Sequence, residues 1–322
     1  MNVEASSQVE LSIVVPFYNE ATIVEVFFLR LTPVLERITH SYEIICVNDG
    51  SSDATLDKLR QKANADPHIR VIDFSRNFGK ESAVSAGLAH SRGAAAVLID
   101  ADLQDPPELI ESFYKKWKQG FDVVYGTRKE RRYDSLPKRI TARAFYRMFN
   151  WMNSIKLPPD AGDFRLLSRQ VIDAINCLPE RRRFMKGIYS WVGFRQTEIE
   201  YERAARSGGT SSWTYWKLWN FALDGLSSFT TFPLRVWTYV GLATLLLSLA
   251  LLAMFFIVYL GSTRNPPGFY WIVTLILFFG SMQMVSIGVM GEYIGRTLEE
   301  TKMRPLYIIR EKIGFESRTE TT

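Results

Sequence analysis

The sequence predicts an α/β domain followed by a hairpin of two transmembrane helices. Three observations lead to this division of the 322 residues. Short apolar runs alternate with helix-length segments between residues 11 and 126, and polar clusters follow three of these runs. Two long segments without a charged residue lie in the last third of the chain.

Five apolar runs have the length and composition of β-strands. They are Leu11–Pro16, Tyr42–Asn48, Ile69–Phe74, Ala95–Ile99 and Asp122–Tyr125. Four helix-length segments separate them. Repeated strand-helix units are typical of a parallel sheet covered by helices, with the ligand site outside the carboxyl ends of the strands.

The first helical segment, after Glu20, shows a 3.6-residue periodicity that predicts one apolar face. The members of this face are Ile23, Val26, Phe27, Val34, Leu35 and Ile38. A polar loop from Arg128 to Ser135 follows the fifth strand and is a candidate mobile flap.

Composition excludes several classes of protein. The formal net charge of +5 is modest for this length, so a nucleic-acid partner is not expected. Two cysteines, Cys46 and Cys177, do not make a disulfide framework. Residues 1–10 lack the basic and apolar regions of a secretory signal, so we expect the N-terminal part to stay in the cytosol.

Two segments predict membrane spans. Val236–Leu260 has 25 residues and Phe269–Gly291 has 23, and neither contains a charge. A buried core helix is the alternative, although such helices rarely run so long without a charged residue. Basic residues flank the outer ends of the pair, whereas Arg264 is the only one in the turn, so both long ends are expected in the cytoplasm.

Aromatic residues crowd the stretch before the first span, including Trp213, Tyr215, Trp216 and Trp219. Such residues prefer the headgroup level, which favours an interfacial amphipathic helix over a packed core helix. The expected divisions are a catalytic domain at 1–205, a juxtamembrane loop and interfacial helix at 206–234, the two spans within 235–291 (about 236–260 and 269–291), and a cytoplasmic C-terminal tail at 292–322.

Asp100 and Asp102 follow the fourth strand directly, and Gln104 comes two residues later. Oxygen ligands of this kind suit Mg²⁺ or Mn²⁺. Solvated loop carboxylates, or a cap for a helix that begins near Pro107, are the alternatives. The three histidines are scattered and neither cysteine has a partner at zinc spacing, so no zinc site competes.

Two nucleotide-binding motifs are absent. Gly79-Lys80-Glu81-Ser82 resembles part of a phosphate-binding loop, but the Walker pattern needs Ser or Thr directly after Lys, and a Gly where Phe74 stands. The first strand is not followed by Gly-x-Gly-x-x-Gly, which argues against a dinucleotide oxidoreductase.

Three ordered motifs carry a family resemblance. They are Pro16-Phe17-Tyr18-Asn19-Glu20, Asn48-Asp49-Gly50-Ser51-Ser52-Asp53 with Thr55, and Asp100-Ala101-Asp102-Leu103-Gln104-Asp105-Pro106-Pro107. Together they resemble the successive signatures of glycosyltransferase family 2. Their spacing, with the two-span tail, is similar to the polyprenyl-phosphate branch, which includes bactoprenol glucosyltransferase and dolichol-phosphate mannose synthase.

The resemblance implies a GT-A (Rossmann-like) catalytic domain that binds a nucleotide-sugar. It implies that Pro16, Tyr18 and Glu20 seat the nucleobase and that Asp49 holds the nucleoside. Asp100, Asp102 and Gln104 match the positions that bind a divalent metal, Mg²⁺ or Mn²⁺, under the diphosphate. A divalent ion there would neutralise the charge that grows on the leaving nucleoside diphosphate.

The resemblance also implies residues for the acceptor and the diphosphate. Arg128 matches the phosphate-binding arginine of the family. Arg139 and Arg143, on the basic side of a predicted amphipathic helix, match positions near the acceptor phosphate. Asp163 stands where the family has an acidic or polar residue at the reaction centre, as a base or as a contact to a sugar hydroxyl.

Arg206 and Ser207 begin a segment similar to the flexible Arg-x-x-Gly-x-Ser of the family, and could cradle the diphosphate. The lysine that usually follows is replaced by Ser212. A plain linker is the alternative for this segment.

The implied reaction is the inverting transfer of a hexose, expected to be glucose from UDP-glucose, to a polyprenyl phosphate, expected to be undecaprenyl phosphate, at the inner membrane. Alternatives are a mannosyl or aminosugar transferase, and an inactive membrane scaffold for a flippase. Processive polymer synthesis is disfavoured, since the chain lacks the Gln-x-x-Arg-Trp signature. Gly291-x-x-x-Gly295 offers a close-approach surface that favours a homo-oligomer.

Overall fold

The computed structural model describes residues 9–128, 161–181, 183–201 and 268–315, and isolated positions between 147 and 254. It divides into two compact units, one of residues 1–218 with 305–322 and one of residues 219–304. The first unit contains β1 (Leu11–Phe17), α1 (Val24–Ile38), β2 (Tyr42–Asn48), α2 (Thr55–Ala65), β3 (Ile69–Phe74), α3 (Lys80–His90), β4 (Ala95–Leu98), α4 (Leu109–Lys118), β5 (Val123–Arg128), β6 (Ala161–Ser168), α6 (Arg169–Asn176), α7 (Met185–Trp191), β7 (Gln196–Tyr201) and β8 (Ile309–Ile313).

One mixed sheet forms the centre of this unit, with the described strands in the order β7-β5-β6-β4-β1-β2-β3-β8. The predicted α/β fold is confirmed, but the predicted all-parallel sheet is wrong. β6 runs antiparallel to both β4 and β5, and β8 runs antiparallel to β3. The four neighbouring strands β4, β1, β2 and β3 are parallel, as expected.

All five predicted strands occur. β2 and β3 have the predicted bounds, and β1 ends one residue later. β4 ends one residue earlier than predicted, and β5 begins at Val123 and extends to Arg128. These strands were recognisable because central strands with both faces covered read as short apolar runs.

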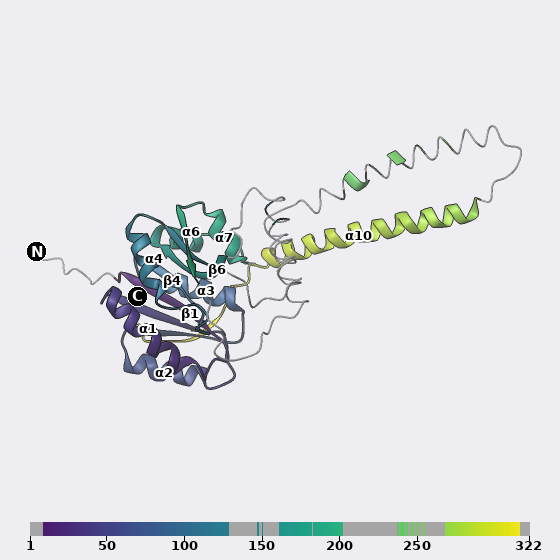
Figure 1. Cartoon of the computed structure of the whole chain (residues 1–322). Helices are drawn as coiled ribbons and strands as arrows, with labels where there is room; N and C mark the ends of the chain where they lie inside the picture. The colour runs from purple at the N-terminus through teal and green to yellow at the C-terminus, as the bar shows by residue number, and fades with distance from the viewer. Residues whose placement is uncertain are drawn as a thin grey trace, which may run out of the picture. The chain divides into compact units, whose positions relative to one another are not determined.

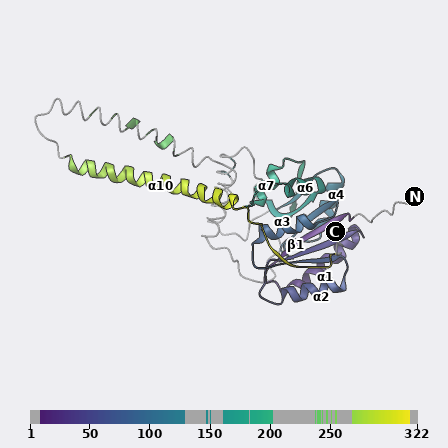
Figure 2. The ribbon, with the colours of Figure 1, turned by 180° about the vertical axis from the view of Figure 1, so that it is seen from behind.

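Helices cover both faces of the sheet. In both views α1 and α2 lie on one side, whereas α3, α6 and α7 lie on the other (Figures 1 and 2). α4 packs against α1 and against β5 and β6, on the side of α1. This arrangement leaves the ends of the strands, rather than the faces of the sheet, accessible to a ligand.

The buried face of α1 differs in part from the predicted one. Phe27, Val34 and Leu35 are buried as expected, but 47% of Val26 is exposed. Phe28 and Leu31 are buried in its place. The helix contacts α2 and α4 as well as the sheet, so its apolar face is shifted from the one that periodicity alone indicated.

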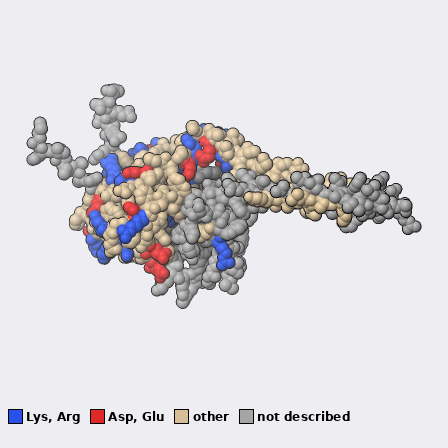
Figure 3. Space-filling view, turned by 90° about the horizontal axis from the view of Figure 1, so that it is seen from above, with Lys and Arg blue, Asp and Glu red and all other residues tan. Residues whose placement is uncertain are grey.

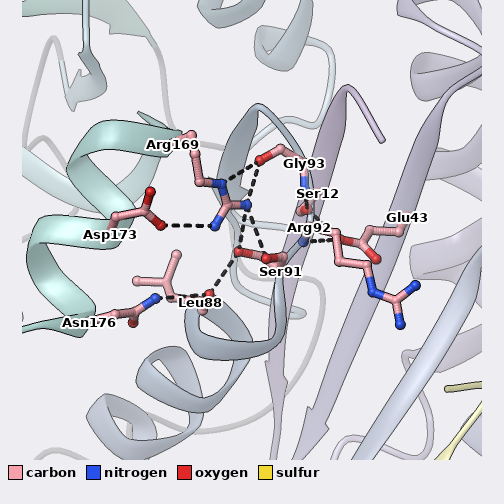
Figure 4. Close-up of polar contacts among 9 residues, drawn as sticks. All are labelled: Ser12, Glu43, Leu88, Ser91, Arg92, Gly93, Arg169, Asp173 and Asn176. Carbon is pink, nitrogen blue, oxygen red and sulfur yellow. Dashed lines mark hydrogen bonds and ion pairs between the residues drawn. The ribbon is translucent and has the colours of Figure 1, made fainter. Parts of the chain in front are cut away.

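Arg169, the first residue of α6, ties the end of β6 to the turn before β4 (Figure 4). Its Nε donates to the carbonyl oxygen of Gly93 at 2.9 Å, and its Nη2 donates to the carbonyl oxygen of Ser91 at 3.0 Å. Its guanidinium also lies 3.6 Å from Asp173, one turn further along α6. These bonds hold β6 against β4 at the end of the sheet opposite the candidate ligand site.

Glu43, on β2, is a buried carboxylate in the same region (Figure 4). Its Oε1 accepts from the Ser12 hydroxyl at 2.6 Å and from the backbone N–H of Arg92 at 2.6 Å. Its other oxygen forms an ion pair with Arg70. Gly93 donates to the Ser12 hydroxyl at 2.8 Å, so the network joins β1, β2 and the turn before β4.

Glu10 makes the stability of this unit depend on pH. Burial alone would raise the pKa of Glu10, but hydrogen bonds from Lys118, Tyr114 and Thr39 outweigh it and lower the pKa from 4.5 to about 2. This stabilisation is complete above the unfolded-state pKa and is lost as the pH falls towards 2. The side chain is partly exposed, so its share is discounted.

We therefore expect Glu10→Gln to lower the free energy of unfolding by about 1–2 kcal/mol at pH 7. The difference from the wild type should shrink as the pH is lowered towards 2. Chemical denaturation of the full chain at several pH values measures both quantities. A difference independent of pH would contradict this assignment.

β8 joins the sheet from the far end of the chain. It pairs with β3, and Tyr307, just before it, stacks on Phe74 with ring centroids 5.0 Å apart. The backbone N–H of Ser75 donates to the carbonyl oxygen of Ile308 at 3.0 Å. The segment 292–322, predicted as a cytoplasmic tail, thus contributes a strand to the sheet of the first unit.

The second unit contains α10 (Phe269–Thr301). It begins at the residue where a span was predicted and continues ten residues past the predicted end at Gly291. Apolar side chains such as Ile276, Met284 and Ile294 are exposed. Among the described residues, no helix meets both the length and the hydropathy of a membrane span. Most of the other predicted span, 236–260, lies outside the described residues, and so does the predicted interfacial helix.

Candidate functional site

The first two sequence motifs form one platform at the carboxyl edge of the sheet. The backbone N–H of Asn19, after β1, donates to the Ser51 hydroxyl at 3.0 Å, and the Ser52 N–H returns to Asn19 Oδ1 at 2.9 Å. Asn19 has a φ of 54°, in the left-handed region that Asn tolerates better than most residues. The N–H of Glu20 donates to Thr55 Oγ1 at 2.9 Å. These bonds hold the two loops in register.

The residues predicted to seat a nucleobase lie on this platform. Tyr18 is 50% exposed, so its ring is available for stacking. Pro16 lines a pocket at the ends of β1 and β4. Glu20, two residues after Tyr18, is half-buried. All three residues lie at or just after the end of β1.

Asp49 is more deeply placed than its predicted contact with a nucleoside suggests. Only 3% of the residue is exposed, and its two carboxylate oxygens accept from the backbone N–H groups of Phe78 at 2.6 Å and Gly79 at 2.9 Å. Burial raises the pKa of Asp49, although these amide bonds act in the opposite direction. In this structure the carboxylate therefore anchors the turn that leads into α3.

Gly50, next to Asp49, is required by the same turn. Its φ is 65°, and a Cβ atom there would lie 2.3 Å from the carbonyl carbon of Arg76. Any other residue would displace the segment 76–79 from Asp49. The glycine thus keeps the second motif in contact with the start of α3.

Lys80, the first residue of α3, is the centre of the charged site. Its Nζ lies 2.7 Å from the Asp100 carboxylate and 2.7 Å from Asp163 Oδ2. Burial alone would lower the pKa of Lys80, but the two carboxylates outweigh it and raise the pKa well above its usual value. The structure therefore brings together Asp100 and Asp163, which the sequence predicted for the site. The residue that joins them, Lys80, was not predicted.

Asp163 lies on β6 between two ammonium groups. Lys186, from α7, approaches Asp163 Oδ1 at 3.8 Å, on the other oxygen from Lys80. Burial alone would raise the pKa of Asp163, but Lys80 and Lys186 hold it well below its usual range. The carboxylate is consequently ionised at neutral pH.

Glu81 forms part of the wall of the same pocket, with Tyr189. Its carboxylate accepts from the backbone N–H of Met185 at the start of α7. Burial, followed by the charge of Asp163, raises the pKa of Glu81 from 4.5 to about 7. Arg165 lies over the Tyr189 ring, 3.8 Å from its centroid, and donates to the carbonyl oxygen of Gly162 at 2.7 Å. These contacts hold α7 and β6 together around Asp163.

The third motif forms a turn after β4. Asp102 Oδ1 accepts from the backbone N–H of Gln104 at 3.2 Å, and Leu103 between them has a φ of 54°. Asp105, which is buried, accepts from the Tyr201 hydroxyl at the end of β7. Asp102 and Gln104 are therefore held on the same turn that begins at Asp100.

The oxygen donors of this turn fit a hard divalent cation. Asp100, Asp102 and Gln104 offer carboxylate and carboxamide oxygens, the ligands that Mg²⁺ and Mn²⁺ prefer. In the described part of the chain, no group of three His, Cys, Asp or Glu side chains is placed to hold a metal by itself. Protein sites for Mg²⁺ commonly use one or two carboxylates and leave positions for substrate phosphate, and this turn carries two carboxylates, those of Asp100 and Asp102.

Several predicted residues lie outside the described residues. They are Arg139, Arg143, Arg206 and Ser207, together with the polar loop after Arg128. Arg128 itself is the last residue of β5, opposite Tyr201 on β7, and its side chain is not described. β5 thus leads the backbone to the carboxyl edge, as predicted.

Acidic and basic side chains alternate on the face of the protein that Figure 3 shows. In the view of Figure 3, the described Lys, Arg, Asp and Glu residues do not form a patch of one sign. Local charge pairs such as those of Lys80 decide the electrostatics of the site.

Comparisons with known proteins agree with this arrangement. The model of glycosyl transferase family 2 matches residues 12–175, which contain the three motifs and Asp163. A protein of Synechocystis sp., described as an uncharacterized glycosyltransferase, is 49% identical over 96% of this chain and 97% of its own length. A prophage bactoprenol glucosyl transferase homolog of Escherichia coli is 44% identical over 94% and 98%.

The bactoprenol glucosyl transferase of Shigella phage SfV is 45% identical, over 94% of this chain and 99% of its own. These relatives extend over nearly the whole chain, not only over the sheet. The mixed α/β sheet with its acidic carboxyl edge is thus a GT-A-like fold, and the chain belongs to glycosyl transferase family 2.

Proposed function

We propose that this glycosyltransferase transfers glucose from UDP-glucose to a polyprenyl phosphate, with undecaprenyl phosphate as the acceptor. The observation that carries the proposal is the near full-length identity to proteins named bactoprenol glucosyl transferase. The juxtaposition of Asp100 and Asp163 through Lys80, at the edge where α/β folds bind ligands, supports a group-transfer site.

In the proposed reaction, an oxygen of the lipid phosphate attacks the anomeric carbon of glucose from the face opposite UDP. The bond from that carbon to the UDP oxygen breaks, and its electron pair leaves with UDP. The product is a β-linked polyprenyl-phosphate glucose. Because a phosphomonoester has a second pKa near 6, the acceptor is largely a dianion at neutral pH and needs no base.

Asp163 is therefore proposed as a contact to a sugar hydroxyl rather than as a general base. A catalytic base is most effective with a pKa near the working pH, whereas Lys80 and Lys186 hold the pKa of Asp163 well below its usual range. A permanently ionised carboxylate is a strong hydrogen-bond acceptor. The proposal thus favours the sugar contact over the base, the two roles that the sequence leaves open for Asp163.

The donor is proposed to bind with a divalent cation, Mg²⁺ or Mn²⁺, held by Asp100, Asp102 and Gln104. When bound, the ion would neutralise charge on the leaving diphosphate. Pro16, Tyr18 and Glu20 would seat the uracil, and Asp49 would support the nucleoside through the turn that it anchors. Arg206 and Ser207 would add contacts to the diphosphate.

The lipid phosphate is proposed to bind beside Arg128, with Arg139 and Arg143 on the membrane side. Arginine suits this role, because its planar group binds phosphate oxygens in pairs. We propose a two-helix hairpin, about 236–260 and 269–291, as the membrane anchor, with an interfacial helix before it. The exposed apolar residues of α10 support this proposal.

A further support is the pairing of β8 with β3. Residues on either side of the unit 219–304 belong to the same sheet, so the chain between them must cross a membrane an even number of times. This is compatible with a hairpin whose two ends, including the catalytic unit, lie on the cytoplasmic side of the inner membrane. We further propose a homo-oligomer, in which Gly291 and Gly295 allow close helix approach.

A panel of radiolabelled nucleotide-sugars, offered with undecaprenyl phosphate to the purified full-length protein, tests the proposed function. We expect UDP-glucose to give a labelled lipid, and GDP-mannose and UDP-aminosugars to give much less. Preferential labelling from GDP-mannose or a UDP-aminosugar would replace glucose with that sugar. Absence of turnover with every donor would instead favour the scaffold for a flippase.

A further inference from the structure

Lys80 lies where three parts of the site meet. It follows Gly79, whose N–H is bound by Asp49, and its Nζ contacts both Asp100 and Asp163 at 2.7 Å. The side chain is 42% exposed, so it borders the pocket rather than the core. No sequence motif that matched the family assigned a role to this lysine.

We propose that Lys80 is a positioning residue for sugar transfer, which fixes the Asp163 carboxylate relative to the metal-ligating residue Asp100. The inference rests on the proposed function, since it concerns the same site. The oxygens that Lys80 binds are at most twice 2.7 Å apart, because both lie 2.7 Å from one nitrogen. Two carboxylates at that separation repel unless a cation lies between them.

Lys186 cannot replace Lys80 in this role. It approaches only Asp163, at 3.8 Å, and it reaches the other carboxylate oxygen from α7. In the described part of the site, Lys80 forms ion pairs with both Asp100, just after β4, and Asp163, on β6. β4 and β6 stay paired without Lys80, but removing its charge leaves the Asp100 and Asp163 carboxylates to repel each other.

The backbone just before Lys80 is itself fixed by hydrogen bonds. Asp49 binds the N–H groups of Phe78 and Gly79, directly before the lysine. The segment before these residues is joined to the C-terminal strand, because Arg310 donates to the carbonyl oxygen of Ser75 at 2.7 Å. A lysine on such a fixed support holds its carboxylate partners in one geometry, whereas a lysine on a loose loop does not.

The test compares Lys80→Met and Lys80→Arg in the full-length protein, with Lys62→Met as the matched control. Lys62 also forms a 2.6 Å ion pair, with Glu25, but on α2, outside the pocket. We expect Lys80→Met to lower kcat for glucose transfer about 100-fold, with a much smaller change in KM for UDP-glucose. Lys80→Arg should recover part of the rate, and Lys62→Met should behave as the wild type.

A double-mutant cycle with Asp163→Asn separates positioning from a general structural effect. If Lys80 acts through Asp163, the double variant loses about as much activity as Asp163→Asn alone. Losses that multiply, or a Lys80→Met enzyme with wild-type kcat, would overturn the proposal. Thermal unfolding of each variant shows whether a loss of rate reflects a loss of folded protein.

Crystal structures of the wild type and Lys80→Met provide a readout that does not depend on the sugar transferred. We expect the Asp163 side chain to turn away from Asp100 in the variant. An unchanged Asp163 would refute the inference even if glucose transfer is confirmed. Conversely, a displaced Asp163 in a protein that does not use UDP-glucose would refute the proposed donor and leave the role of Lys80 intact.

Discussion

Asp102→Ala is expected to reduce glucose transfer by about 1,000-fold or more, because it removes one of the oxygen ligands proposed for the cation that stabilises the leaving diphosphate. The protein should remain folded, since Asp102 lies on a turn beyond the end of β4 and is only half-buried. Transfer of radiolabelled glucose measures the rate, and calorimetry of UDP binding with and without Mg²⁺ measures the metal dependence.

The matched control is Asp57→Ala, on the outer surface of α2, where the carboxylate is 72% exposed and makes a long ion pair with Arg60 at 3.9 Å. It should leave both the rate and UDP binding unchanged. Removal of divalent ions by a chelator should reduce the wild type to the level of Asp102→Ala. Substantial transfer by Asp102→Ala, or by the chelated wild type, would disprove the metal assignment.

The second large effect concerns stability. Glu43→Ala is expected to lower the free energy of unfolding by about 3–5 kcal/mol, the typical cost of removing one partner from a buried ion pair. The side chains of Glu43 and Arg70 are 2% and 12% exposed, so the Arg70 charge would remain without compensation. Ser12 and the Arg92 N–H would also lose their acceptor.

Chemical denaturation of the full-length protein measures this loss. Glu111→Ala is the control, because Glu111 pairs with Lys115 on the surface of α4 and such pairs contribute well under 1 kcal/mol. Glu43→Gln keeps the side-chain volume and some hydrogen bonds. Its loss in the free energy of unfolding should therefore lie between those of Glu43→Ala and Glu111→Ala. A loss below about 1 kcal/mol for Glu43→Ala would show that the network of Figure 4 does not stabilise the fold as argued.

Sequence patterns were sufficient for the parallel half of the sheet and insufficient for its two ends. Strands such as β2 are buried along their whole length and mostly apolar, because helices cover both faces, and the bounds of β2 were predicted correctly. β8 has the sequence Ile-Arg-Glu-Lys-Ile, and its three charged central residues read as a polar tail. In the segment of β6 the sequence indicated only the site residue Asp163, and the pairing of β6 between β4 and β5 has no local signal.

The same distinction holds for the site. Asp100, Asp102 and Asp163 were recognisable from strand ends and from the family resemblance. The sequence around Lys80 is not a Walker motif, so no role was assigned to this lysine. Its long side chain nevertheless reaches two carboxylates that are distant in sequence. Lys186 was missed for the same reason. Which cations face a carboxylate depends on how α3, α7 and β6 pack, and no spacing along the chain encodes it.

The position of β8 has a consequence for the order in which the protein is made. β3 is synthesised early, but its outer edge pairs with a strand that follows the whole of the unit 219–304. During translation the catalytic sheet thus has an open edge, which invites pairing with other chains until β8 arrives. Completion of the enzyme is therefore a late event, which comes only after the 219–304 unit has been synthesised.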